Sequence, residues 1–209
     1  MARASLTKRR LVGIDRSGGP PPQTVKGQPL RPWTIPNAIG FVRLALIPVF
    51  LILALGSGDG RVASATIVYT VIAWSDYLDG IAARLTGQYS RLGALLDPLT
   101  DRMLVVSGVI VAWHFELLPR PALAVLAARE LGMLVLTQIG LRRGLDLNVN
   151  MLGRLAVFPT MSSIFLAMVS VTWVADALLY LGLAMTLGAT AIYARDARRQ
   201  LAPRPSTSA

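Results

Sequence analysis

The segment DYLDGIAARLTGQYSRLGALLDPLTD, residues 76–101, places four aspartates at fixed spacings in an otherwise apolar part of the chain. The residues on either side, 67–74 and 103–114, are almost entirely apolar, and the whole chain holds only 11 Asp and Glu. Carboxylates in or at the edge of a membrane are unfavourable unless something pairs with them. Four of them within one short segment therefore indicate a functional site.

Helical periodicity would sort these aspartates onto two faces. The two sets lie on successive helices and consist of Asp76, Asp79 and Ala83 at i, i+3 and i+7, and of Gly93, Asp97 and Asp101 at i, i+4 and i+8. Two such faces brought together would supply carboxylate oxygens, which are the ligands that hard cations such as Mg²⁺ or Mn²⁺ prefer. The segment therefore predicts a metal site, and two ions held there could clamp a phosphate.

The composition predicts an integral membrane protein. Hydrophobic residues make up 54% of the chain and charged residues 15%, which is too apolar for a soluble domain of this length. Six apolar stretches could each cross about 30 Å of hydrocarbon: 35–55, 62–83, 92–115, 121–141, 151–172 and 175–194. We expect an all-α fold with six transmembrane helices in one domain, residues 34–200, between a disordered basic tail, 1–33, and a disordered tail, 201–209.

The distribution of basic residues predicts the orientation. The loops expected outside hold Arg61 and Arg120, whereas both tails and the other loops hold most of the remaining Arg and Lys. By the positive-inside rule, both termini and the aspartates face the cytoplasm of a multi-pass protein in the cell membrane. The net charge of +10 is then largely topological, so no nucleic-acid partner is expected. The chain has no cysteine, which excludes disulfides, thiol catalysis and Cys-ligated zinc.

The complete frame is Asp76-x-x-Asp79-Gly80-x-x-Ala83-Arg84, then Gly93-x-x-x-Asp97-x-x-x-Asp101. It resembles the signature of the CDP-alcohol phosphotransferase family at every fixed position. A pattern of so many residues at fixed distances is far more specific than a lone glycine motif.

The resemblance implies a role for each residue of the frame. The ligands of two Mg²⁺ or Mn²⁺ ions would be Asp76, Asp79, Asp97 and Asp101. Asp101 would also be the base that takes the proton of the acceptor hydroxyl. The pocket for the CDP moiety would be lined by Gly80, Ala83, Arg84 and Gly93.

The resemblance also implies the reaction. The donor would be CDP-diacylglycerol, and CMP would be released when an alcohol attacks the phosphorus on the lipid side. The runs Trp33-Thr34-Ile35-Pro36-Asn37 and Ala128-Arg129-Glu130 resemble the bacterial phosphatidylglycerophosphate synthase branch. That resemblance implies sn-glycerol 3-phosphate as the acceptor and phosphatidylglycerophosphate as the product, which is the function expected first. A phosphomonoester needs cationic partners, and Arg43, Arg129 and Arg154 are the expected acceptor-binding residues.

Several alternatives stay open at the level of sequence. Residues 90–98 resemble cardiolipin synthases of the actinobacterial type, which use phosphatidylglycerol as acceptor, and Gly153-Arg154 replaces the Gly-Lys of the first branch. Phosphatidylinositol-phosphate synthesis is a third reading. A divalent-cation transporter would use the carboxylates for permeation instead. The expected partners are CDP-diacylglycerol, a small anionic alcohol or phospholipid acceptor, membrane lipids and, as an option, a second copy of the chain.

Overall fold

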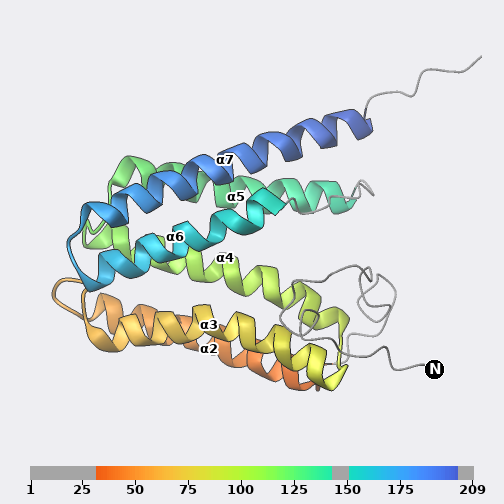
Figure 1. Ribbon diagram of the computed structural model, residues 1–209, viewed down its shortest axis with the longest axis horizontal. Coiled ribbons are helices and arrows are strands. Elements are labelled where there is room, and N and C mark those ends of the chain that lie inside the picture. Colours follow the sequence, from red (N-terminus) through yellow and green to blue (C-terminus); the bar gives the residue numbers. More distant parts are fainter. Residues whose placement is uncertain (1–31, 143–150, 202–209) are drawn as a thin grey trace, which may run out of the picture. The chain divides into compact units, whose positions relative to one another are not determined.

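The computed structural model describes residues 32–142 and 151–201, which form six α-helices and no strand. In chain order the helices are α2 (Ile35–Leu55), α3 (Ala63–Thr86), α4 (Arg91–His114), α5 (Arg120–Arg142), α6 (Met151–Val169) and α7 (Trp173–Leu201) (Figure 1). The predicted all-α class is therefore confirmed. The two predicted tails, apart from residues 32–33 and 201, lie outside the described residues.

The helix bounds follow the apolar stretches closely, with one clear extension. α7 runs to Leu201, beyond the predicted end at residue 194. The added segment reads Arg-Asp-Ala-Arg-Arg-Gln-Leu, which is rich in strong helix formers although it is not apolar. The helix therefore continues beyond the apolar stretch because residues 195–201 have high helix propensity.

Membrane-spanning character is clearest in two helices of the described part. Residues Ile35–Leu55 and Trp173–Arg195 are long and apolar enough to cross a bilayer, and the shorter segments Ala63–Ser75 and Leu155–Val169 are apolar too. Charged residues such as Asp101 on α4 and Arg129 on α5 interrupt the other helices. Six spans therefore stay a prediction.

The chain divides into two compact units. The first contains α2, α3 and α4 as far as Ser107, and the second contains residues 57–62, the rest of α4, and α5 to α7. In the first unit α2 packs along α3 (Figure 1). The rings of Phe50 and Tyr69 meet there with centroids 5.3 Å apart.

Within the first unit, α2 and α4 run in the same direction. Asn37 is bonded to Ser90 at the N-terminus of α4, and Gly40, one turn further on, lies against Leu96. A later residue of α2 therefore contacts a later residue of α4, as expected for parallel helices. This register fixes which residue of α2 faces each turn of α4.

In the second unit, α6 and α7 pack closely (Figure 1). Their buried side chains include Ile164 and Met168 on α6 and Leu179 on α7. A Cβ atom added to Gly182 of α7 would lie 2.4 Å from Oγ1 of Thr160 on α6 and 3.0 Å from its backbone nitrogen. Only glycine therefore fits at this crossing.

Candidate active site

The predicted frame lies on two helices of the first unit. α3 carries Asp76, Asp79, Gly80, Ala83 and Arg84, and α4 carries Gly93, Asp97 and Asp101. Both segments are helical, so each set shares the face that its spacing predicts. The side chains of four charged members lie outside the described part of the structure: Asp76, Asp79, Arg84 and Asp97.

Asp101 is the aspartate of the frame whose surroundings are described. Its side chain is 33% exposed, and Oδ1 accepts a hydrogen bond from Nη2 of Arg43 at 3.0 Å. A carboxylate that is both partly accessible and held by a charged donor has a defined orientation. Asp101 can therefore present its carboxylate in a fixed place.

Arg43 itself is buried and contacts two helices of the first unit. The residue is 1% exposed, and its Nε donates to the carbonyl oxygen of Ile72 on α3 at 3.2 Å. The same carbonyl accepts from Oγ of Ser75 at 2.9 Å. Ile72 lies one helical turn before Asp76. Arg43 therefore contacts both the turn of α3 that precedes the first aspartate of the frame and Asp101, which is the last one.

These contacts permit a test of whether the residues fit a metal. Through Arg43, the aspartate-bearing part of α3 and the level of Asp101 on α4 are brought together within one unit. The donor set of the frame is made entirely of carboxylates, which fits hard divalent cations. No cluster of three metal-ligating side chains is found among the described residues, and three of the four predicted ligands lie outside that search. The residues fit the ion, and the site stays a prediction.

A second polar cluster surrounds Gly93. Oγ of Ser90 accepts from the backbone N–H of Gly93 at 2.9 Å, which caps α4, and donates to Oδ1 of Asn37 at 2.8 Å. Nδ2 of Asn37 in turn donates to the carbonyl of Pro32 at 3.1 Å. The sequence alone does not predict this cluster, although Ser90, three positions before Gly93, has the spacing of an N-cap.

Gly93 therefore faces protein atoms. A Cβ atom at Gly93 would lie 2.8 Å from Oδ1 of Asn37 and 3.2 Å from Oγ of Ser90. The absence of a side chain at this position lets the N-termini of α2 and α4 meet. The assignment of Gly93, Gly80 and Ala83 to a nucleotide pocket stays a prediction.

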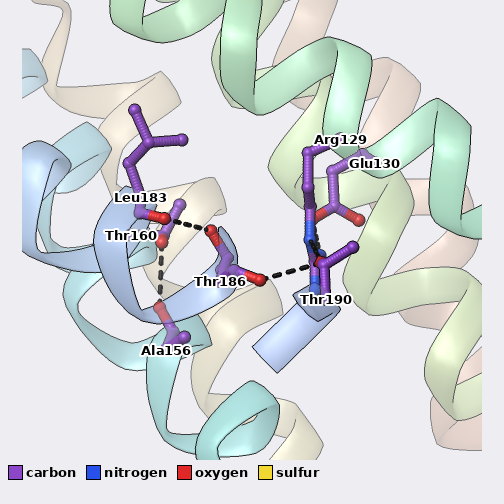
Figure 2. Close-up of polar contacts among 7 residues, drawn as sticks. All are labelled: Arg129, Glu130, Ala156, Thr160, Leu183, Thr186 and Thr190. Atoms are coloured by element: carbon purple, nitrogen blue, oxygen red, sulfur yellow. Dashed lines mark hydrogen bonds and ion pairs between the residues drawn. The ribbon is translucent and has the colours of Figure 1, made fainter. Parts of the chain in front are cut away.

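The predicted acceptor-binding arginines lie in different units. Arg43 belongs to the first unit and Arg129 to the second, while the side chain of Arg154 lies outside the described part. Figure 2 shows Arg129 on α5 reaching toward α7: its Nη1 donates to Oε1 of Glu130, and its Nε donates to Oγ1 of Thr190 at 3.1 Å. Oγ1 of Thr190 donates in turn to the carbonyl of Thr186 at 2.8 Å.

The charges of Arg43 and Arg129 are already compensated. Glu130 is buried and sits beside Arg129, and Asp101 sits beside Arg43. Such pairing is the usual way in which a charge becomes tolerable inside an apolar region. The assignment of the three arginines to acceptor binding stays a prediction.

Comparisons with known proteins confirm the family that the sequence pattern indicates. Residues 33–188 match the family profile of CDP-alcohol phosphatidyltransferases. The chain is 37% identical to cardiolipin synthase (CMP-forming) of Streptomyces coelicolor over 191 residues, 88% of this chain and 89% of that protein.

Two further relatives carry another name. The CDP-diacylglycerol–glycerol-3-phosphate 3-phosphatidyltransferase of Bacillus subtilis is 30% identical over 135 residues, which are 59% of this chain and 70% of that protein. The probable phosphatidylglycerophosphate synthase of Mycobacterium tuberculosis is 35% identical over 112 residues, which are 52% of this chain and 53% of that protein. The profile covers most of the chain, and the Streptomyces relative aligns over nearly all of it. The chain therefore belongs to the CDP-alcohol phosphatidyltransferase family, a family of membrane-bound transferases of phospholipid biosynthesis.

Proposed function

We propose that this transferase moves the phosphatidyl group of CDP-diacylglycerol to a hydroxyl group of phosphatidylglycerol, forming cardiolipin and releasing CMP. The observation that carries the choice of acceptor is the alignment with the Streptomyces cardiolipin synthase over 88% of the chain. The relative named as a glycerol-3-phosphate 3-phosphatidyltransferase aligns over 59% of the chain, and the one named as a probable phosphatidylglycerophosphate synthase aligns over 52%. Family membership makes the chain a transferase, so the transporter alternative is not carried further.

The ion pairs that the described arginines form support the same acceptor. A phosphomonoester brings close to two negative charges and needs an excess of cationic partners. Arg43 is enclosed and paired with Asp101, and Arg129 is paired with buried Glu130. Neither supplies an uncompensated charge, which favours a phosphodiester lipid whose reacting end is a neutral alcohol.

The bond changes are those of a displacement at phosphorus. The acceptor hydroxyl oxygen forms a bond to the phosphorus on the lipid side, and the bond from that phosphorus to the CMP oxygen breaks. CMP leaves with the electron pair of that bond. Asp101, whose carboxylate Arg43 holds, is the proposed base for the hydroxyl proton.

The metal ligands are proposed to be Asp76, Asp79, Asp97 and Asp101, with two Mg²⁺ or Mn²⁺ ions as cofactors. When bound, such ions would offset the negative charge of the phosphoryl oxygens. The proposed donor pocket is formed by Gly80, Ala83, Arg84 and Gly93. Arg84 offers a planar fork of donors that suits a phosphate or a cytosine carbonyl.

The proposed arrangement in the membrane has six spans, with both termini and the aspartates on the cytoplasmic side. Two helices of the described part meet the length and hydropathy expected of spans. The excess of Arg and Lys in the tails, together with Arg84, Arg91, Arg142 and Arg143 at or near helix ends, favours this orientation. The acyl chains of both lipids could then remain in the bilayer while the cytidine reaches water.

A competition assay tests the acceptor. Purified protein in mixed lipid micelles receives one pool of CDP-diacylglycerol together with phosphatidylglycerol, glycerol 3-phosphate and inositol phosphate, and the products are identified by lipid mass. We expect cardiolipin and CMP in equal amounts, and no product in the presence of excess chelator. Phosphatidylglycerophosphate as the main product would contradict the proposed acceptor and leave the family chemistry intact.

Glycerol 3-phosphate is the second candidate. The motif Ala128-Arg129-Glu130 favours it, and so do the names of the Bacillus and Mycobacterium relatives. Arg129 would then have to exchange part of its contact with Glu130 for the phosphate. In that case Arg129→Ala should raise KM for glycerol 3-phosphate about ten- to a hundredfold, the typical effect of losing a charge-assisted hydrogen bond.

A further inference from the structure

A buried arginine joins the two helices that carry the predicted metal ligands. Arg43 lies on α2, which carries no aspartate, and contacts both of the helices that do. Nη2 donates to Asp101 on α4 at 3.0 Å, and Nε donates to the carbonyl of Ile72 on α3 at 3.2 Å. Each contact falls on an aspartate of the frame or one turn before one.

We propose that Arg43 is a positioning residue of the active site, which holds Asp101 in one orientation and ties the turn before Asp76 to the same level of the unit. This inference rests on the proposed function, since it concerns the residue assigned as base and ligand there. It gives Arg43 a different task from the acceptor binding that the sequence pattern suggests.

The side-chain chemistry of arginine suits this task. A guanidinium carries several N–H donors in a rigid plane, so two of them can serve a carboxylate and a carbonyl on different helices at once. Lysine concentrates its charge on one nitrogen and lacks this fork. Because Arg43 is fully enclosed, the orientation of its guanidinium is set by packing as well as by hydrogen bonds.

Burial also separates positioning from direct binding. At 1% exposure Arg43 has almost no surface that an acceptor could touch, whereas the Asp101 side chain is 33% exposed. The aspartate is thus the accessible partner and the arginine the support behind it. Residues that orient metal ligands in this way typically change metal affinity or activity about 10- to 100-fold when removed.

The backbone fixes the reach of Arg43. One turn earlier on α2, a Cβ atom at Gly40 would lie 3.8 Å from Leu96, so α2 and α4 approach closely just before the Arg43–Asp101 contact. Two turns earlier, Asn37 is bonded to Ser90. With the register held at these two points, Arg43 and Asp101 cannot slide past one another.

The test compares Arg43→Met, which keeps the length of the side chain without its donors, with Arg43→Lys and with Arg61→Met. Arg61 is a matched control because its Nε also donates to a backbone carbonyl, that of Ala167, at 3.1 Å. Arg61→Met therefore removes the same type of bond without touching the aspartate frame. The quantities measured on purified protein are the Kd for Mn²⁺ without substrate by electron paramagnetic resonance, kcat, KM for CDP-diacylglycerol, KM for phosphatidylglycerol, and the midpoint of thermal unfolding.

We expect Arg43→Met to raise the Kd for Mn²⁺ and to lower kcat, each about 10- to 100-fold. At saturating Mn²⁺, KM for the donor should stay near its original value, because Arg43 itself makes no contact with the donor in the proposed site. Arg43→Lys should recover part of the Mn²⁺ affinity, since it keeps the charge. Arg61→Met should leave the Kd and kcat unchanged.

Two results would overturn the proposal. One is an Arg43→Met protein that keeps the original Kd for Mn²⁺ and the original kcat. The same holds if its only change is a fall in thermal midpoint equal to that of Arg61→Met. The other is a selective rise in KM for the acceptor with unchanged Mn²⁺ binding, which would make Arg43 an acceptor ligand. If Arg43→Met does not fold, Arg43→Lys and Arg43→Gln decide by the same measurements.

The Mn²⁺ measurement keeps the two proposals distinguishable. It needs neither donor nor acceptor, so it reports on Arg43 even if the unaltered protein makes no cardiolipin. A wild-type protein that binds Mn²⁺ and forms a different lipid refutes only the proposed acceptor.

Discussion

At Gly93, a hydrogen atom in place of a side chain lets the N-termini of two helices share a polar cluster. Asn37 is only 1% exposed and is bonded to both Ser90 and Pro32, so its amide cannot move aside without losing hydrogen bonds. A glycine on the aspartate-bearing face would also let a nucleotide approach. The two roles make different predictions for the same substitution.

Gly93→Ala should lower the free energy of unfolding by about 1–3 kcal/mol, the usual effect of overpacking a tight site. The added Cβ would be 2.8 Å from Oδ1 of Asn37. Thermal unfolding of Gly93→Ala, Asn37→Ala and the double variant measures the coupling between the two positions. If the contact with Asn37 dominates, the double variant is more stable than the sum of the single effects requires.

The nucleotide role gives the contrary result for Gly93→Ala. KM for CDP-diacylglycerol would rise, and Asn37→Ala would not restore it, because the obstruction would be to the ligand. Equal KM values in all variants would leave Gly93 as a packing residue alone.

At the scale of elements, the crossing of α6 and α7 depends on Gly182. The atoms that an added Cβ would meet include the backbone nitrogen and Cα of Thr160, at 3.0 Å and 3.2 Å. Backbone atoms of a helix cannot yield as the end of a side chain can. Small residues at such positions let helices approach closely in apolar surroundings, where packing rather than hydrophobic burial holds them together.

Gly182→Ala should therefore destabilise the protein, whereas Gly132→Ala should not. Gly132 lies on α5 and has no atom within 4 Å of an added Cβ among the described residues, so its replacement brings only the higher helix propensity of alanine, about 1 kcal/mol. The thermal midpoints of the two variants in detergent provide the measurement. A midpoint for Gly182→Ala at or above that of Gly132→Ala would show that the crossing adjusts freely.

The connection of α5 to α7 is polar. Arg129 bonds to Thr190 across the two helices and is neutralised by Glu130 within its own helix (Figure 2). Two adjacent residues of a helix do not normally face each other, yet here the two side chains run alongside one another and their charged ends meet (Figure 2). The ion pair with Glu130 and the hydrogen bond to Thr190 together make the charge of Arg129 tolerable inside the second unit.

Glu130→Gln should lower the free energy of unfolding by about 3 kcal/mol, because it leaves the charge of Arg129 without compensation in a mostly buried place. Thr190→Val should cost about 1 kcal/mol, the value of one hydrogen bond. Glu116→Gln is the matched control: Glu116 pairs with Arg120 at 2.9 Å, but both side chains are exposed, and such pairs contribute little. Equal unfolding midpoints for Glu130→Gln and Glu116→Gln would contradict the structural role of the buried pair.

At the scale of the whole molecule, the orientation in the membrane is the property that matters for the reaction, because a cytidine nucleotide has to reach the aspartates from water. The segment between α2 and α3 carries Asp59 and Arg61, and the C-terminal end carries a run of arginines. The proposed topology puts these two regions on opposite sides.

Single-cysteine labelling tests this topology cleanly, because the chain has no cysteine of its own. Gly58→Cys changes an exposed loop residue with no neighbour within 4 Å of an added Cβ among the described residues. We expect a membrane-impermeant maleimide added to intact cells to label Gly58→Cys, and Ser208→Cys to be labelled only after the membrane is opened. The reverse pattern would invert the proposed orientation and place the aspartates outside.

The sequence by itself determined the helices and the faces of the aspartates. Apolar length and the 3.6-residue period are local properties, so the bounds of α2 to α6 and the stripe of Asp97 and Asp101 follow from residues close together in the chain. The frame of eight fixed residues is also defined by spacing along the chain, so it indicates the family without any knowledge of tertiary contacts.

Only the tertiary structure decided the partners. Which side chains meet depends on which helices are neighbours and on the register in which they pack. The contacts decided in this way are Arg43 with Asp101, Asn37 with Gly93, and Arg129 with Thr190. The residues of these pairs lie more than fifty positions apart in the chain, and a periodic pattern specifies a face without specifying what lies against it. An arginine in an apolar segment therefore looks the same in sequence whether it binds a substrate or holds a carboxylate in place.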